Sequence, residues 1–131
     1  MEKKAKRGRC GAWNLNYHLV WTPKRRAPVL KGLIATDLKE LIVQKATELG
    51  LEIKAIEAMP DHVHVFVSSI PQLSPHRIVK AFKGLTSNVL RKKYPQLLKL
   101  PSLWSSSYYC GSVGEVSESV VKAYIEAQKR S

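Results

Sequence analysis

Apolar and polar residues alternate along two segments of the chain, as they do in half-buried β-strands. The first segment runs from Trp13 to Trp21. One side of it carries Trp13, Leu15, Tyr17, Leu19 and Trp21, and the other carries Asn14, Asn16 and His18. The second segment runs from His62 to Ser68, where valines at every second position alternate with His62, His64 and Phe66. Further strands are predicted over Leu51 to Ala58 and Ser107 to Val113.

Apolar residues recur at helical spacing elsewhere. One such stripe ends at Gly50 and consists of Ile34, Leu38, Leu41, Ile42, Ala46 and Leu49. A second helix is predicted to begin with Ser74 as its cap and Pro75 in its first turn, the preferred order at a helix N-terminus. Its stripe consists of Ile78, Phe82, Leu85 and Val89. A last helix is predicted from about Ser117 to Lys129.

The order of these elements is β-α-β-β-α-β-α, which predicts an α+β fold. We expect a ferredoxin-like, or RRM-like, sandwich in which a mostly antiparallel sheet carries its helices on one face. The length of 131 residues indicates a single domain spanning residues 1–131. Residues 1–9 carry five basic side chains and no apolar run, so they are predicted to form a flexible basic arm.

The charge balance indicates the partner. Lys and Arg number 22 against 10 Asp and Glu, giving a net charge of +12 and favouring a polyanion, either nucleic acid or an anionic membrane. No stretch approaches a membrane span, and Met1 is followed by charged residues rather than a signal sequence. Cys10 and Cys110 form no disulfide framework and are expected to be reduced thiols. We therefore expect a cytoplasmic protein that binds nucleic acid and no membrane.

Two short motifs could carry chemistry. In the strand after Asp61, His62 and His64 project from the same face, and two adjacent imidazoles suit a divalent metal; the alternative is a solvent face that happens to hold two histidines. Asp61 could orient an imidazole or form the turn, and the turn is favoured. In the last helix, Tyr124 and Gln128 are spaced i, i+4 and share one face, although this spacing also suits a core-edge aromatic beside a solvated polar residue.

Basic side chains form a third, more diffuse feature. Together with the amino-terminal arm they could line a phosphate-binding surface. The candidates are Lys24, Arg25, Arg26, Lys80, Lys83 and Arg91. A merely soluble surface is the alternative, but the net charge exceeds what solubility requires.

Five short motifs occur in order along the chain. They are Tyr17-His18-Leu19-Val20-Trp21-x-Pro23-Lys24-x-Arg26, Met59-Pro60-Asp61-His62-Val63-His64, Phe82-Lys83-Gly84, Leu103-Trp104 with Ser107-Tyr108, and Tyr124-Ile125-x-x-Gln128. Together they resemble the small single-tyrosine HUH transposases of the insertion-sequence 200/605 group, often called TnpA. The resemblance covers Trp13 to Gln128.

The resemblance implies an activity and a site, in a prokaryotic, nucleoid-associated protein. Tyr124 would be the nucleophile that cleaves single-stranded DNA, and His62, His64 and Gln128 would bind Mg²⁺ or Mn²⁺. The DNA would carry hairpins at the ends of the element, and the working unit would be a homodimer. The last helix could then place its tyrosine beside the partner's histidines, with Gly111 and Gly114 as a hinge. A monomer, or a dimer whose Tyr124 meets the histidines of its own chain, is the alternative.

Two other functional classes remain as alternatives. A histidine-triad nucleotide hydrolase needs a third histidine on the strand, where this chain has Phe66. A non-catalytic single-strand binder would stack bases on Trp13, Tyr17 and Trp21. That interpretation explains the charge and the aromatic residues, but it gives no reason for Tyr124 and Gln128.

Overall fold

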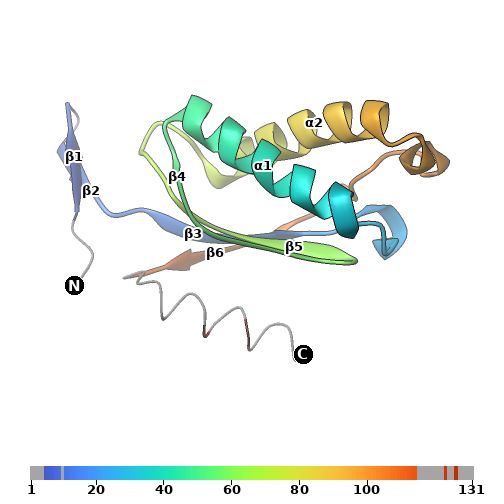
Figure 1. Ribbon diagram of the computed structural model, residues 1–131. Coiled ribbons are helices and arrows are strands. Elements are labelled where there is room, and N and C mark those ends of the chain that lie inside the picture. Colours follow the sequence, from blue (N-terminus) through green and yellow to red (C-terminus); the bar gives the residue numbers. More distant parts are fainter. Residues whose placement is uncertain (1–4, 10, 115–122, 124–125, 127–131) are drawn as a thin grey trace.

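The computed structural model describes residues 5–9, 11–114, 123 and 126. Its main sheet consists of β3 (Asn16–Trp21), β4 (Glu52–Met59), β5 (His62–Ser68) and β6 (Tyr109–Val113). The strand order is β4-β5-β3-β6, and every neighbouring pair is antiparallel. The helices α1 (Gly32–Leu49) and α2 (Pro75–Lys93) lie side by side on one face of this sheet (Figure 1). The predicted ferredoxin-like α+β sandwich is thus confirmed.

Local signals define the helices as the sequence suggested. The Ser74 hydroxyl accepts a hydrogen bond from the Arg77 amide at 3.2 Å, and Pro75 follows as the first residue of α2. Gly50 ends α1 in the left-handed conformation, with φ of 78°, which a glycine adopts at no steric cost. Of the helix predicted over residues 117–129, only positions 123 and 126 are described, and both are helical.

The main core lies between the sheet and the two helices. Its helical side includes Leu38 and Ile42 from α1 and Ile78 and Phe82 from α2, all fully buried. The sheet contributes what we call the helical face: Leu19, Trp21, Val63, Val65 and Val67. After the short 3-10 helix η2 (Pro95–Lys99), Leu103 and Trp104 return to this core, where the indole Nε1 donates to the Thr86 hydroxyl at 2.9 Å.

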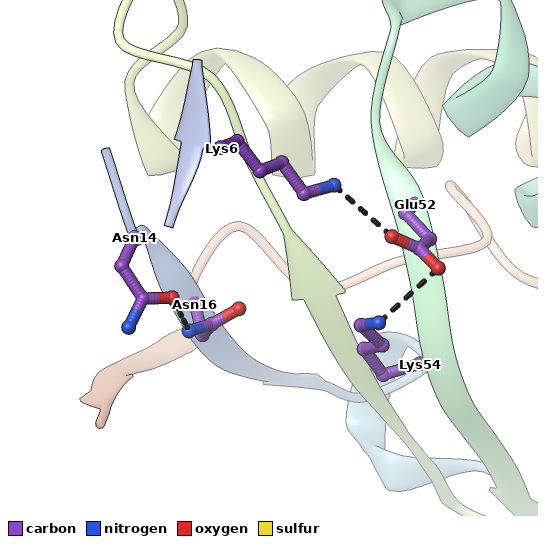
Figure 2. Close-up of polar contacts among 5 residues, drawn as sticks. All are labelled: Lys6, Asn14, Asn16, Glu52 and Lys54. Carbon is purple, nitrogen blue, oxygen red and sulfur yellow. Dashed lines mark hydrogen bonds and ion pairs between the residues drawn. The ribbon is translucent and has the colours of Figure 1, made fainter. Parts of the chain in front are cut away.

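The amino-terminal segment differs from the expected arm and strand. Lys6–Gly8 form β1, which pairs with β2 (Gly11–Trp13) as a separate hairpin. Lys6 also reaches Glu52 at the start of β4, and Glu52 binds Lys54 with its other carboxylate oxygen (Figure 2). Residues 6–8 are therefore a paired strand rather than a flexible arm, because β2 and an ion pair on the sheet give them partners. The strand predicted from Trp13 to Trp21 is interrupted at residues 14 and 15.

No helix in the described part of the chain combines the length and the hydropathy needed to cross a membrane.

Candidate active site

The strand β5 presents different side chains on its two faces. Val63, Val65 and Val67 are buried in the helical face, as the alternation predicted. His62, His64 and Phe66 lie on the opposite face, together with His18 of the neighbouring strand β3. We call these four residues the histidine face. The sequence also allowed these histidines to lie on a face exposed to solvent. The structure excludes this, because His18, His64 and Phe66 are each only 2% exposed.

His62 is oriented by a carboxylate. Its Nδ1 lies 2.8 Å from Oδ1 of Asp61, and the other carboxylate oxygen binds the Arg26 guanidinium at 3.0 Å. The pKa of Asp61 is lowered, chiefly by the hydrogen bond with His62 and further by the charge of Arg26. Asp61 lies in the turn between β4 and β5, which confirms the favoured interpretation, and its side chain also orients the imidazole, as the alternative proposed.

His64 is held by another histidine. Its Nδ1 lies 3.0 Å from Nε2 of His18, on the adjacent strand. The pKa of His18 is lowered to about 4, mainly by burial and secondarily by the nearby His64. At neutral pH the His18 imidazole is therefore uncharged. Sequence reasoning missed His18 as a site residue, although its position opposite the apolar side of the first strand already placed it on the non-core face.

The two β5 imidazoles are close together, with ring centroids 4.9 Å apart and planes at 78°. In each ring the nitrogen engaged by its neighbour is Nδ1. Among the described residues, no three His, Cys, Asp or Glu side chains gather as a complete set of metal ligands. The expected third ligand, Gln128, and the expected nucleophile, Tyr124, lie outside the described residues.

Tyr109 and Gly111 line the edge of this face on β6. The Tyr109 ring packs edge-on against His18, with centroids 5.7 Å apart. A Cβ atom at Gly111 would lie 2.5 Å from the Tyr109 hydroxyl, so a larger residue there would displace the end of this half-exposed ring. Gly111 lies within β6 and is paired with His18, rather than in a connection after the strand, and a hinge at this position stays a prediction. Gly114 does follow the strand, where its carbonyl accepts from Asn16 Nδ2 at 2.9 Å.

The predicted DNA-contacting cations have different surroundings. Lys83 donates to the carbonyls of Ser105 and Ser107 at 2.8 and 2.9 Å, and burial lowers its pKa. Arg91 donates to the carbonyls of Leu100 and Pro101. Both side chains thus secure the loop after η2. Arg26, in the short 3-10 helix η1 (Lys24–Arg26), pairs with Asp61, whereas Arg25 and Lys80 are exposed and Lys24 is half-buried.

A pocket of about 460 Å³ lies between α2 and the segment 102–108. Its polar lining includes His76, Lys80, Lys83 and Tyr108. The pocket borders α2, whereas His18, His62 and His64 lie on the other face of the sheet.

Two of the three rings that the non-catalytic alternative would use for stacking face the helices. Trp21 is 1% exposed and packs against Phe82 and Trp104 in the helical core. Tyr17 is partly buried against the same core. Neither ring is therefore offered to a base on the histidine face, and this alternative keeps only Trp13, which is half-buried in the β1-β2 hairpin.

Comparison with known families identifies the chain. Residues 11–128 match the family model described as "Transposase IS200 like". The chain therefore belongs to the IS200-like transposases. The ISDra2 transposase TnpA of Deinococcus radiodurans is 39% identical over 126 residues, which cover 94% of this chain and 90% of that protein. The transposase for insertion sequence element IS200 of Salmonella typhimurium is 24% identical over 88% of this chain and 78% of its own length.

Solved structures agree in fold. A crystal structure of a Deinococcus radiodurans R1 protein assigned as a transposase has a TM-score of 0.77 and 38% identity, covering 94% of this chain and 97% of that chain. A REP-associated tyrosine transposase bound to a REP hairpin has a TM-score of 0.61 at 13% identity, covering 99% of this chain and 73% of that chain. The second likeness concerns the fold alone.

Proposed function

We propose that this transposase cleaves and rejoins single-stranded DNA at the ends of its insertion sequence, with Tyr124 as the nucleophile. The observation that carries the proposal is the pair of β5 imidazoles, His62 and His64, each held through Nδ1 by a neighbour. In a member of the IS200-like family, this pair is the natural place for the divalent metal that phosphoryl transfer uses.

The donor set fits a metal. A histidine that ligates a metal commonly has its other nitrogen engaged by a carboxylate, carbonyl or similar group, as Asp61 engages His62 here. His62, His64 and Gln128 would hold the ion. Two imidazoles favour Mn²⁺ over Mg²⁺, which prefers oxygen ligands. When bound, the ion would polarise the scissile phosphate and stabilise charge on the departing 3′ oxygen.

The chemistry assigned to the chain itself is a transesterification. The deprotonated Tyr124 oxygen attacks the phosphorus, the bond from phosphorus to the 3′ oxygen breaks, and the 3′ oxygen takes up a proton. The products are a 5′-phosphotyrosine and a free 3′-OH. Attack by a 3′-OH on the phosphotyrosine reverses these steps and releases Tyr124. The phosphotyrosine ester conserves the energy of the cleaved phosphodiester bond, so strands are rejoined without ATP.

The charge of the chain supports binding of DNA. A net charge of +12 supplies the phosphate contacts that dominate affinity for nucleic acid. A structural relative was solved bound to a REP hairpin, and we propose that hairpins at the element's ends are recognised here too. The best candidates for phosphate contacts are Lys24, Arg25 and Lys80, whose side chains make no hydrogen bond or ion pair within the part of the chain that the structure describes.

A covalent adduct tests the proposed nucleophile. Single-stranded oligonucleotides that tile both strands of the DNA flanking the gene are incubated with the protein and Mn²⁺, then run on a denaturing gel. A 3′ label should appear in a protein–DNA band and a 5′ label in a shorter free strand. Tyr124→Phe should remove the band but keep DNA binding, because it deletes only the attacking oxygen. Tyr108→Phe and Tyr109→Phe are the matched controls; loss of the band in one of these instead would refute Tyr124.

We also propose that the active unit is a homodimer. Each chain supplies one nucleophile, whereas excision of an element requires two ends to be cut and held. A two-fold dimer provides two symmetry-related tyrosines for two similar ends. Following the family pattern, Tyr124 of one chain would act beside His62 and His64 of the other.

Mixing of variants tests this arrangement. Tyr124→Phe protein and His64→Ala protein, each inactive alone, are combined under conditions that exchange subunits. A site assembled across chains regains one intact nucleophile beside one intact histidine pair, so part of the cleavage should return. Absence of cleavage in heterodimers verified by mass would place nucleophile and metal ligands on one chain.

A further inference from the structure

His18 and His64 meet on the histidine face, from strands that lie 46 residues apart in the sequence. We infer that His18 is a positioning residue of the active site: its Nε2 accepts the Nδ1–H of His64 and thereby directs Nε2 of His64 to the metal. This inference rests on the proposed function, because it assumes that His64 is a metal ligand.

The geometry of the two rings supports a directed hydrogen bond. Nε2 of His18 and Nδ1 of His64 are 3.0 Å apart, and the ring planes differ by only 8°. The centroid separation of 5.2 Å is about the nitrogen–nitrogen distance plus one ring radius at each end. The rings are therefore in line rather than face to face, so the N–H of one points along the lone pair of the other.

The direction of this bond follows from the chemistry of a metal ligand. A neutral imidazole carries one proton, and the nitrogen that binds a metal cannot be the one that carries it. If Nε2 of His64 is the ligand atom, its proton must be on Nδ1. His18 is then the acceptor at Nε2 and carries its own proton on Nδ1. The same reasoning gives His62 a proton on Nδ1, which it donates to Asp61.

His18 is itself fixed by packing. Its ring stacks on Phe66, with centroids 4.4 Å apart and planes 7° from parallel. The register pairs His18 with Phe66 on β5 and with Gly111 on β6, and the edge of Tyr109 closes against it. A group held in this way can hold a ligand in turn, because the groups around a metal ligand set its tautomer and ring orientation.

The matched variants separate the hydrogen bond from the packing. His18→Phe keeps a flat ring against Phe66 but removes the acceptor, and His18→Gln restores an acceptor oxygen. His76→Phe is the control, because it makes the same replacement at an exposed helical position that contacts Tyr108. Thermal unfolding of each variant confirms that it is folded before the other measurements are made.

Two measurements test the role. Long-range ¹H–¹⁵N correlations on the metal-free protein near neutral pH report which nitrogen of His64 carries the proton, and calorimetry reports Mn²⁺ affinity. We expect an Nδ1 proton on His64 in the wild type. His18→Phe should shift that proton toward Nε2 and weaken Mn²⁺ binding about 10- to 100-fold. His18→Gln should recover part of the affinity, and His76→Phe should change neither.

The outcomes distinguish this inference from the proposed function. An Nε2 proton on His64 in the wild type, or an unchanged Mn²⁺ affinity in folded His18→Phe, would overturn the role of His18 alone. If the wild type bound no Mn²⁺, or if His64→Ala bound it as tightly as the wild type, the proposed metal site would fall and the inference with it.

Discussion

The two faces of the sheet differ in how they hold their buried side chains. On the helical face, Val63, Val65 and Val67 are covered by helices that also bring apolar residues. On the histidine face, His18 and His64 are equally buried, yet they are polar and are held by hydrogen bonds and ring contacts. The two faces are formed by alternate residues of the same strands. They therefore differ in the polarity of their side chains and not in how deeply these side chains are buried.

The difference separates stability from function. Burial of apolar side chains stabilises the fold in proportion to the area removed from water. Burial of an imidazole stabilises it only where the ring nitrogens find partners, since an unpaired polar group is costly to desolvate. The histidine face therefore adds less to stability than the helical face does, and we expect its buried imidazoles to serve the proposed reaction. Substitutions on the helical face should accordingly lower mainly the free energy of unfolding, whereas substitutions on the histidine face should lower mainly DNA cleavage and Mn²⁺ binding.

The largest effect should come from removing an imidazole. His62→Ala and His64→Ala should each abolish DNA cleavage and Mn²⁺ binding, because each deletes a proposed ligand. His64→Ala should also destabilise the protein by about 1–3 kcal/mol, since the buried His18 nitrogen loses this partner. His62→Ala should cost less, because the His62 side chain is 21% exposed. Cleavage assays, calorimetry and urea unfolding give the three quantities. Retained cleavage in either variant would mean that its histidine is not a ligand.

The sequence was informative wherever the determinants are local. The alternation of valines in β5 and the Ser74-Pro75 start of α2 lie within single elements, and both are confirmed by the structure. The order of elements was also enough for the fold class, because short connections leave few ways to arrange β-α-β-β-α-β.

Interactions between distant segments could not be predicted in this way. The contact of His18 with His64 depends on the register of two strands, and the pairing of Arg26 with Asp61 depends on where a loop meets a turn. Charge alone suggested that Arg26, Lys83 and Arg91 bind DNA, but it could not show that each has an internal partner. The roles of Tyr124 and Gln128 stay predictions, as these positions lie outside the described residues.

A substitution that leaves a cavity in the helical face should lower stability without lowering cleavage, the opposite of what the imidazole variants should do. Val65→Ala removes two buried methyl groups from the core and should lower the free energy of unfolding by about 2 kcal/mol. Cleavage and Mn²⁺ affinity should stay at the wild-type level at temperatures where the variant is folded. Loss of Mn²⁺ affinity in the folded variant would show that the two faces are not independent.

The smallest effect should come from Arg26, where the prediction from charge and the finding from structure disagree. Its guanidinium binds Asp61, but the side chain is 65% exposed, and an exposed ion pair contributes only about 0.5 kcal/mol. Arg26→Gln should therefore weaken Mn²⁺ binding by about twofold, through looser orientation of His62 by Asp61. DNA binding without metal should be unchanged. Arg25→Gln is the matched control: it removes the neighbouring exposed charge, so it should weaken DNA binding and leave Mn²⁺ affinity as it is. The reverse result, in which Arg26→Gln lowers DNA affinity and not Mn²⁺ affinity, would return Arg26 to the DNA surface.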